Sequence, residues 1–384
     1  MKRWKTPVAA FAAVTLIVAA CGGDDNGDSA DTTAAPDTTA AGGDETPETT
    51  AAPEPAPEPA ADLAGTLSGA GATFPNPVFQ EWAFDYNADV QSGVEIDYAS
   101  IGSGGGIEQF LLQTVDFGAS ERYLRDDDLA SALEDRGCEA VQFPVLFGAV
   151  VVAFGDDQFD GLVLSAEVIA GIFQREITKY NDPAIAELNP DVDLPDLDII
   201  PVHRSDGSGT TSVFTTYLED AAPNWTLGSG TEVQWPAGTI GGQGNEGVTV
   251  GIEQNPGGIG YVNQAYALVN DLPTALVINS DGNAVEGSLA ATTEALDVLE
   301  IPDNFQFDIL GVGGGGYPIV GAVWVFVYEC GYDDNTAAML IDYWTWATQS
   351  DQATELAENL GYPVLGPGLR PRVLEAINRI NSAE

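Results

Sequence analysis

The chain of 384 residues is 44% hydrophobic and carries a formal net charge of −47, from 59 acidic against 12 basic residues. This apolar content is enough for a sizeable core and excludes a chain that is disordered throughout. The charge excludes a nucleic-acid partner, because the basic stripes that neutralise phosphates are missing, and it predicts a heavily solvated surface.

Residues 1–20 are typical of a signal peptide. A basic stretch at 2–5 precedes an apolar run at 7–20 that is too short to span a bilayer comfortably. The sequence Val-Ala-Ala-Cys at 18–21 resembles the lipobox of bacterial lipoproteins, in which the cysteine is acylated and becomes the new N-terminus. We therefore expect Cys21 to carry a lipid. The alternative is an ordinary signal peptide with an incidental cysteine.

Residues 21–62 consist mainly of Asp, Thr, Ala, Pro, Gly and Glu, with no aromatic residue. Such a segment cannot bury enough apolar surface to offset the entropy of ordering it. We expect a disordered tether that holds a folded body just off the membrane surface. The remaining length suggests two lobes rather than a single core.

From residue 63 onward, short apolar runs alternate with helical stretches. The predicted strands are, in chain order, 94–98, 115–119, 145–154, 199–202 and 320–328. The predicted helices are 107–114, 166–173, 182–188, 211–218, 337–349 and 373–380. The runs at 145–154 and 320–328 are nearly continuous, which is typical of strands buried on both faces. Strands that alternate with helices predict an α/β architecture.

Two cysteines, Cys138 and Cys330, remain after the lipobox. Outside the cytoplasm, a lone pair of cysteines is more often bridged than free. A zinc site lacks support, because His203 is the single histidine and the sequence has no close pair of cysteines. We predict no metal site.

Three turns rich in Gly, Ser and Thr follow strand-like stretches or open helices. They are Gly-Ala-Gly-Ala-Thr-Phe at 69–74, Gly-Ser-Gly-Gly-Gly at 102–106 and Arg-Ser-Asp-Gly-Ser-Gly-Thr at 204–210. Small residues at such turns let a ligand approach the backbone, and the first N–H groups of a helix lack partners within it. Hydroxyl groups add donors without adding charge. The pattern predicts an anion site.

Arg204 stands at the entry of the third turn and is a scarce cation in this acidic chain. Its planar guanidinium can bind two oxygens at once, and Asp206, two residues on, is placed to orient it. The alternative for Arg204 is a surface ion pair with any of the 59 acids. His203 could serve a hydrolase, but a lone histidine at this place is more often a bystander at the end of a strand.

Enzymatic interpretations of these loops fail on residue types. The sequence has no GxxxxGK[ST] motif, which excludes a P-loop nucleotidase. The turn at 69–74 lacks the third glycine of a dinucleotide fingerprint, and the glycine directly before Ser208 excludes a GxSxG elbow. We predict no catalytic residue and no cofactor.

Several motifs together resemble the phosphate-binding subunit of the high-affinity phosphate ABC transporter. They are, in order, 69–75, 101–105, 115–120, 204–210, 241–245 and 256–262. The resemblance runs from about residue 67 to 266, and more faintly to the C-terminus. It implies a type II two-lobe periplasmic-binding fold, with 63–144 and 318–384 in lobe one and 145–317 in lobe two.

The resemblance also implies the residues that hold inorganic phosphate between the lobes. Lobe one would supply donors from Thr73, Phe74 and Ser103. Lobe two would supply Arg204, bidentate to two oxygens and held by Asp206, with further donors at a helix start. These further donors are Ser208, Gly209 and Thr210. Both Cys138 and Cys330 would fall in lobe one, which allows a bridge.

One position departs from the family pattern. Where the family commonly has an aspartate after Gly-Ala-Ser, this chain has Glu121. The family acid accepts a hydrogen bond from the proton of hydrogen phosphate, whereas fully ionised sulfate would meet a repelling carboxylate. Glutamate keeps this chemistry with one more methylene. Either the loop shifts to accommodate it or selectivity changes, and an exposed Glu121 with no ligand role is the third interpretation.

The sequence therefore predicts an exported lipoprotein at the outer face of the cytoplasmic membrane or in the periplasm. It would act as a monomer and pass phosphate to the permease subunits of an ABC transporter. Alternatives are a binding protein for another oxyanion such as sulfate or molybdate, a secreted phosphatase, and a cell-surface sensor or adhesin. The phosphatase would need a metal cluster or an activated nucleophile, and the sequence shows neither.

Overall fold

The computed structural model describes residues 62–297 and 299–382, which belong to one compact unit, Glu58–Glu384. The signal peptide predicted for 1–20 and the lipidated Cys21 lie outside the described residues. So does the predicted tether, apart from Asp62.

The strands of the described residues form one sheet of eight strands and a smaller sheet of three. The large sheet has the order β2 (Gly93–Ser100), β1 (Ala64–Gly71), β3 (Phe117–Ser120), β11 (Val320–Tyr328), β4 (Ala140–Phe154), β8 (Gly258–Asn263), β6 (Ile200–Arg204), β7 (Ile240–Gly242). The small sheet has the order β10 (Ala284–Glu286), β9 (Leu276–Ile278), β5 (Val163–Leu164).

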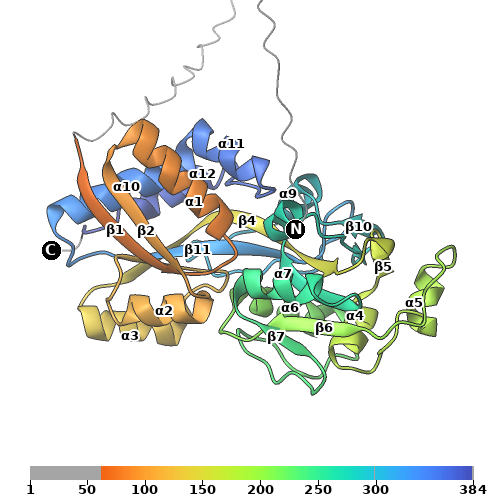
Figure 1. The fold of residues 1–384 in the computed structure, drawn as a ribbon. Coiled ribbons are helices and arrows are strands. Elements are labelled where there is room, and N and C mark those ends of the chain that lie inside the picture. Colours follow the sequence, from red (N-terminus) through yellow and green to blue (C-terminus); the bar gives the residue numbers. More distant parts are fainter. Residues whose placement is uncertain (1–61, 298, 383–384) are drawn as a thin grey trace, which may run out of the picture. The chain divides into compact units, whose positions relative to one another are not determined.

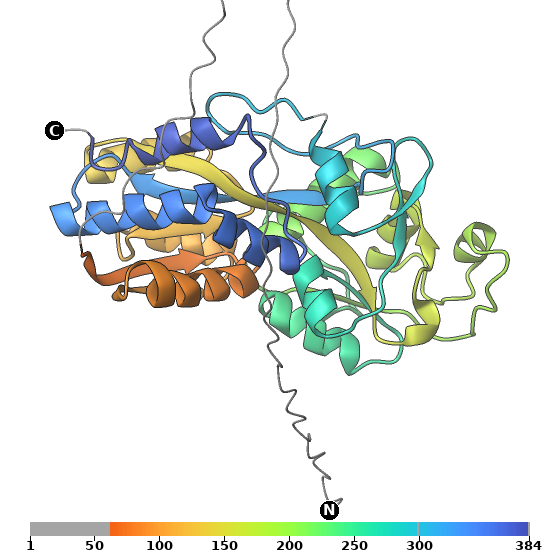
Figure 2. The ribbon, with the colours of Figure 1, turned by 90° about the horizontal axis from the view of Figure 1, so that it is seen from above.

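Strand β4 joins two lobes of this sheet. Its first part, as far as Ala149, pairs antiparallel with β11, while its last part, from Val150 to Phe154, pairs antiparallel with β8. On one side β1 pairs parallel with β2 and β3, and on the other side β6 pairs parallel with β7 and β8. Figures 1 and 2 show β4 running from one lobe into the other. This arrangement confirms the predicted α/β fold of two lobes.

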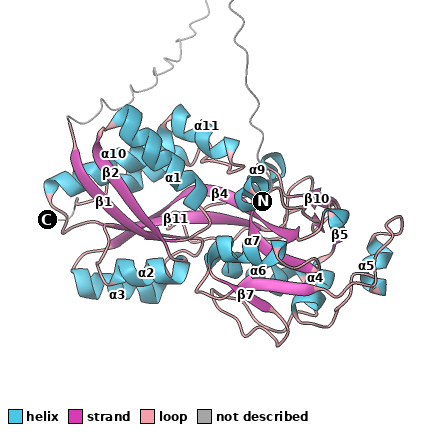
Figure 3. Ribbon diagram, in the orientation of Figure 1, coloured by secondary structure: helices cyan, strands magenta, loops and turns pink. Residues whose placement is uncertain are grey.

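Helices cover the sheet in both lobes (Figure 3). The helices around β1, β2 and β3 are α1 (Asn76–Asp85), α2 (Ser103–Leu111), α3 (Asp126–Arg136), α10 (Asp334–Gln349), α11 (Asp351–Asn359) and α12 (Arg370–Ile377). The helices of the other lobe are α4 (Ala166–Phe173), α5 (Pro183–Leu188), α6 (Gly209–Ala221), α7 (Gly244–Glu253), α8 (Gln264–Val269) and α9 (Leu289–Leu296). In Figure 1, α2 and α3 lie on the opposite face of the first lobe from α1, α10 and α11. A π-helical turn, Tyr86–Val90, continues α1, and a 3₁₀ turn, Asp157–Phe159, follows β4.

The predicted elements recur with shifted ends. Helix α4 and strand β11 have the bounds that the sequence predicts. Strand β4 is buried along its whole length, but it begins before the predicted 145, at Ala140. Pro144 lies inside it, beside an irregularity in the pairing with β11 next to Trp324. Such an irregularity accommodates a residue that has no N–H to donate.

Aromatic side chains fill the core of the first lobe. Trp344 of α10 is completely buried and packs edge-on against Phe79 and Phe117. Trp346, two residues on, is only partly buried. The aromatic stretch of α10 therefore serves packing in this lobe.

Cys138 and Cys330 form a disulfide with a Cα–Cα distance of 6.1 Å. Cys138 lies between α3 and β4, and Cys330 lies two residues after the end of β11. The bridge therefore fastens together the outer ends of the two neighbouring antiparallel strands β4 and β11.

Candidate functional site

The three Gly-rich turns meet at one place. They follow the carboxyl ends of β1, β2 and β6 and lead into α1, α2 and α6. A backbone hydrogen bond of 2.8 Å from Gly104 N to Gly207 O joins the second turn to the third, across the two lobes. Ligands of open α/β folds bind at these carboxyl ends, because the adjoining helix starts present free N–H groups there.

Glycine is required where the turns touch. Gly102 has a φ of +89°, and a side-chain carbon placed on it would lie 2.4 Å from Asp206 Oδ2. A side-chain carbon on Gly209 would lie 2.5 Å from both Ser103 Oγ and Glu121 Oε2. At Gly209 the lack of a side chain lets groups of the other lobe approach the start of α6 directly.

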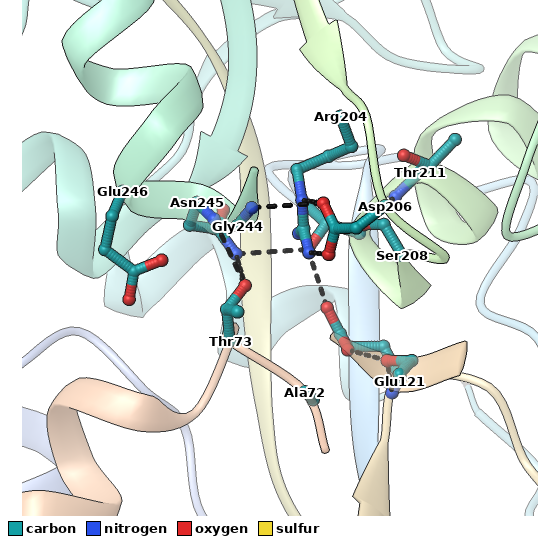
Figure 4. Close-up of polar contacts among 12 residues, drawn as sticks. Ala72, Thr73, Glu121, Arg204, Asp206, Ser208, Thr211, Gly244, Asn245 and Glu246 are labelled. Carbon is teal, nitrogen blue, oxygen red and sulfur yellow. Dashed lines mark hydrogen bonds and ion pairs between the residues drawn. The ribbon is translucent and has the colours of Figure 1, made fainter. Parts of the chain in front are cut away.

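Arg204 lies at the end of β6 with its side chain buried. Its Nε donates to Asp206 Oδ1 at 2.8 Å and its Nη2 to Asp206 Oδ2 at 2.5 Å, while its Nη1 donates to Thr210 Oγ1 at 3.2 Å. Among the described residues, these bonds occupy three of the five N–H donors of a guanidinium. The two others can bind two oxygens of an anion. Figure 4 shows Asp206 beside the guanidinium.

The ion pair of Arg204 and Asp206 favours the charged form of both side chains. Burial acts to lower the pKa of Arg204, but the hydrogen bond and the charge of Asp206 outweigh it and raise the pKa above its usual value. Burial acts to raise the pKa of Asp206, and Arg204 together with the N–H of Gly244 lowers it below its usual value. Gly244 N donates to Asp206 Oδ1 at 3.0 Å and so ties the start of α7 to the pair.

Glu121 is a buried carboxylate, 4% exposed, that follows β3. Ser103 Oγ donates to its Oε2 and Thr210 Oγ1 to its Oε1, both at 2.6 Å. Burial raises its pKa, and the hydroxyls of Ser103 and Thr210, followed by the charge of Arg204, oppose this shift. Among the three interpretations of this residue, the exposed one is wrong, because the side chain lies inside the site.

Two turn residues are held by their carbonyl groups. Tyr266 donates its hydroxyl to Thr73 O and Tyr362 donates its hydroxyl to Phe74 O, each at 2.6 Å. The ring of Phe74 is fully buried. Only the backbone of Phe74 can therefore serve a ligand, whereas Thr73 also presents its hydroxyl group.

The start of α6 supplies the remaining predicted donors. Ser208 caps the helix, and its Oγ accepts a hydrogen bond of 3.0 Å from Thr211 N. The N–H groups of Gly209 and Thr210, at the first two helical positions, have no acceptor within the helix. These N–H groups therefore add to the donors around Arg204.

Asn245 belongs to the same cluster of polar groups, although no sequence motif assigns it a role. Its Nδ2 donates to Thr73 Oγ1 at 2.7 Å and to Thr210 Oγ1 at 3.3 Å, so it links the two lobes. Its Oδ1 accepts from Asn263 N at 2.9 Å. The signal was present in a fourth Gly-rich turn, 241–245, where Gly244 with a φ of +69° opens α7. The motif at 241–245 carries part of the family resemblance, but it does not by itself point to a contact between Asn245 and Thr73.

His203 lies outside this set. Its ring stacks on Trp235 at 4.9 Å, its Nδ1 lies 2.8 Å from Arg204 O, and burial lowers its pKa. No group of three or more His, Cys, Asp or Glu within the described ranges 62–297 and 299–382 could hold a metal ion. The same ranges contain no helix that is both long and apolar enough to cross a membrane.

The fold and this site define a class of protein. The family model of the PBP superfamily domain matches residues 56–352, and the chain belongs to that superfamily. A high-affinity periplasmic phosphate-binding protein solved with bound phosphate has the same fold, with a TM-score of 0.69 and 20% identity over 80% of this chain and 93% of that chain.

Within this class, the chain belongs to the family of phosphate-binding proteins PstS. It is 37% identical to the phosphate-binding protein PstS of Xylella fastidiosa over 79% of this chain and 82% of that protein. It is also 37% identical to the protein of the same name from Pasteurella multocida, over 76% of this chain and 85% of that protein.

Proposed function

We propose that this protein binds inorganic phosphate between its two lobes outside the cytoplasm and delivers it to an ABC transporter for import. One observation carries this function. Arg204, fixed by two hydrogen bonds to Asp206, lies in a buried site with the hydroxyls of Ser103 and Thr210 and the start of α6. Hydrogen bonds to a charged group contribute ~1.5–3 kcal/mol each, so such a set supports at least micromolar binding.

Each lobe has its own part in binding. Thr73, Phe74 and Ser103 donate from the first lobe. The second lobe donates from Arg204, which takes two phosphate oxygens, and from three residues at the start of α6, Ser208, Gly209 and Thr210. Asp206 positions Arg204 without touching the anion.

Glu121 provides the discrimination. A carboxylate can accept a hydrogen bond from the proton of hydrogen phosphate, whereas sulfate at neutral pH carries no proton and is repelled by the negative charge of Glu121. The position of Glu121, among the donors rather than on the surface, supports this role.

The lobe boundaries at 63–144 with 318–384, and 145–317, belong to the same proposal. Strand β4 exchanges its partner β11 for β8 after Ala149, which supports a crossing within β4. We propose further that the chain acts as a monomer held by a lipid on Cys21 at the outer face of the cytoplasmic membrane, where permease subunits meet it. The lipobox at 18–21 supports this location.

Equilibrium dialysis of the full-length protein against labelled phosphate tests the function, with sulfate and arsenate as competitors. We expect one site per chain, a Kd of about 1 μM or tighter, and little competition by sulfate. Sulfate binding as tight as phosphate binding would replace the proposal with another oxyanion carrier. We expect no turnover when the purified protein is incubated with a chromogenic phosphate ester, and turnover that follows the protein would make it a phosphatase.

A further inference from the structure

Glu121 lies where the two lobes meet and bonds to both. Ser103, its partner at 2.6 Å, opens α2 in the first lobe, and Thr210, also at 2.6 Å, lies in the first turn of α6 in the second lobe. The carboxylate is 4% exposed, so both bonds are shielded from water. Glu121 therefore forms a bridge of hydrogen bonds between the lobes and also lines the site.

The hydroxyl protons of Ser103 and Thr210 both bond to Glu121. Thr210 Oγ1 accepts from Arg204 Nη1 at 3.2 Å and from Asn245 Nδ2 at 3.3 Å, so its single proton points to Glu121. Ser103 Oγ accepts from Glu121 N at 3.3 Å and gives its proton to Glu121 Oε2. A hydroxyl has one proton, so neither can donate to a phosphate oxygen while it donates to Glu121.

The carboxylate also occupies the space at the helix start. A side-chain carbon on Gly209 would lie 2.5 Å from Glu121 Oε2, which places this oxygen directly against the first residue of α6. This is the place where the N–H groups of Gly209 and Thr210 would meet an anion. The extra methylene of glutamate lengthens the side chain by about 1.5 Å relative to aspartate and gives it this reach.

We propose that Glu121 acts as an internal anion that holds the two lobes together and competes with phosphate for the hydroxyls of Ser103 and Thr210. Phosphate takes over both hydroxyls when it binds, and its own proton then bonds to Glu121. A fully ionised anion can take the hydroxyls but leaves the buried carboxylate without a donor, so the exchange favours hydrogen phosphate. This inference rests on the proposed function, because it assigns to phosphate the donors that Glu121 uses.

The amide of Gly104 reports the bridge without any ligand, because its acceptor is Gly207 O of the other lobe. We would compare hydrogen exchange of this amide in phosphate-free full-length protein, in Glu121→Asp and in Glu108→Asp. Glu108 is an exposed residue of α2 and loses the same methylene. We expect exchange at Gly104 to be about tenfold faster in Glu121→Asp and unchanged in Glu108→Asp. Thr210→Val, which removes the hydroxyl from the other side, should give the same increase.

Calorimetric titration with phosphate tests the competition. Because aspartate cannot reach both hydroxyls, Glu121→Asp should bind phosphate about tenfold more tightly, whereas Glu108→Asp should bind as the natural protein does. Unchanged exchange at Gly104 would overturn the bridge, and unchanged or weaker phosphate binding by Glu121→Asp would overturn the competition. If no variant binds phosphate, the proposed function fails, while the exchange experiment still decides the bridge.

Discussion

The two lobes contribute to the site in different ways. On the side of β6, Arg204, Asp206 and Gly244 bond to one another within one lobe, so the cation is fixed before the lobes meet. On the side of β1 and β3, Thr73 and Glu121 bond to residues of the other lobe, Asn245 and Thr210. We infer that one lobe carries a preorganised anchor for negative charge, while the other carries groups whose contacts depend on closure.

Changing the anchor should have the largest effect. In Arg204→Lys the positive charge remains, but the planar group that holds Asp206 and still offers two donors is lost. We expect phosphate binding to weaken about 100- to 1000-fold, measured by calorimetric titration. Arg379→Lys, at an exposed arginine with its own ion pairs, is the control and should change nothing. A loss of less than tenfold in Arg204→Lys would mean that charge alone anchors the anion.

Replacing Asp206, which holds Arg204, should weaken binding less than replacing Arg204 itself. It should also change how the unfolding free energy depends on pH. Asp206→Asn should weaken phosphate binding about 10- to 50-fold, because Arg204 is no longer held in place. The folded-state pKa of Asp206 lies below its usual value. Its ionised form therefore adds stability that is fully present above about pH 4 and is lost as the pH falls through the folded pKa.

Urea unfolding of the natural protein and Asp206→Asn at several pH values measures this pH dependence. We expect the gap in unfolding free energy to be largest near pH 7 and to close as the pH falls below about 4. Asp220→Asn, at an exposed residue of α6, is the matched control. A gap that stays constant with pH would show that the pair does not depend on the charge of Asp206.

A substitution of Asn245 tests the contact with Thr73, which forms only when the two lobes close on each other. Asn245→Ala removes the donor to Thr73 and Thr210 and leaves the N–H of Asn263 without its buried acceptor. We expect about tenfold weaker phosphate binding and about 1–2 kcal/mol lower unfolding free energy. Asn255→Ala, which loses a local bond to Gly251 O after α7, should leave the affinity within about twofold. Equal losses in both variants would contradict a role of Asn245 in the site.

The smallest effect on phosphate binding should come from a larger side chain where the turn at 102–106 touches the turn at 204–210. A side-chain carbon on Gly104 would lie 3.1 Å from Gly207 Cα, a tight approach that slight opening of the lobes relieves. Gly104→Ala should therefore weaken phosphate binding about threefold, mainly through faster dissociation in stopped-flow measurements. Gly368→Ala, which would meet nothing within 4 Å, is the control. Slower dissociation in Gly104→Ala would mean that closure does not hold the ligand.

Local sequence patterns predicted helices and strands that consist mainly of apolar residues. They failed where contacts with distant residues determine the start of an element. Helix α2 was predicted from 107, but it begins at Ser103 and includes three glycines of poor helix propensity. Gly106 packs closely on Gly71, because a side-chain carbon placed on Gly106 would lie 2.3 Å from the Cα of Gly71. A contact with a residue far away in the sequence thus requires the glycines, and no local pattern reveals it.

The site shows the same division. Arg204 and Asp206 are neighbours in the sequence, so their pairing could be predicted from a scarce cation and an acid two residues away. The partnership of Asn245 with Thr73 joins residues 172 positions apart and depends on how the lobes close. The contact of Glu121 with Thr210 likewise joins the two lobes, and the sequence alone left three interpretations of Glu121 open.

An electron-density map from crystals of the full-length protein grown with phosphate would show whether the anion binds between the lobes on Arg204. We expect tetrahedral density between the turns at 69–74, 102–106 and 204–210, with two of its oxygens bonded to Arg204 and one facing Glu121. Phosphate bound elsewhere, or bound here without Arg204, would contradict it.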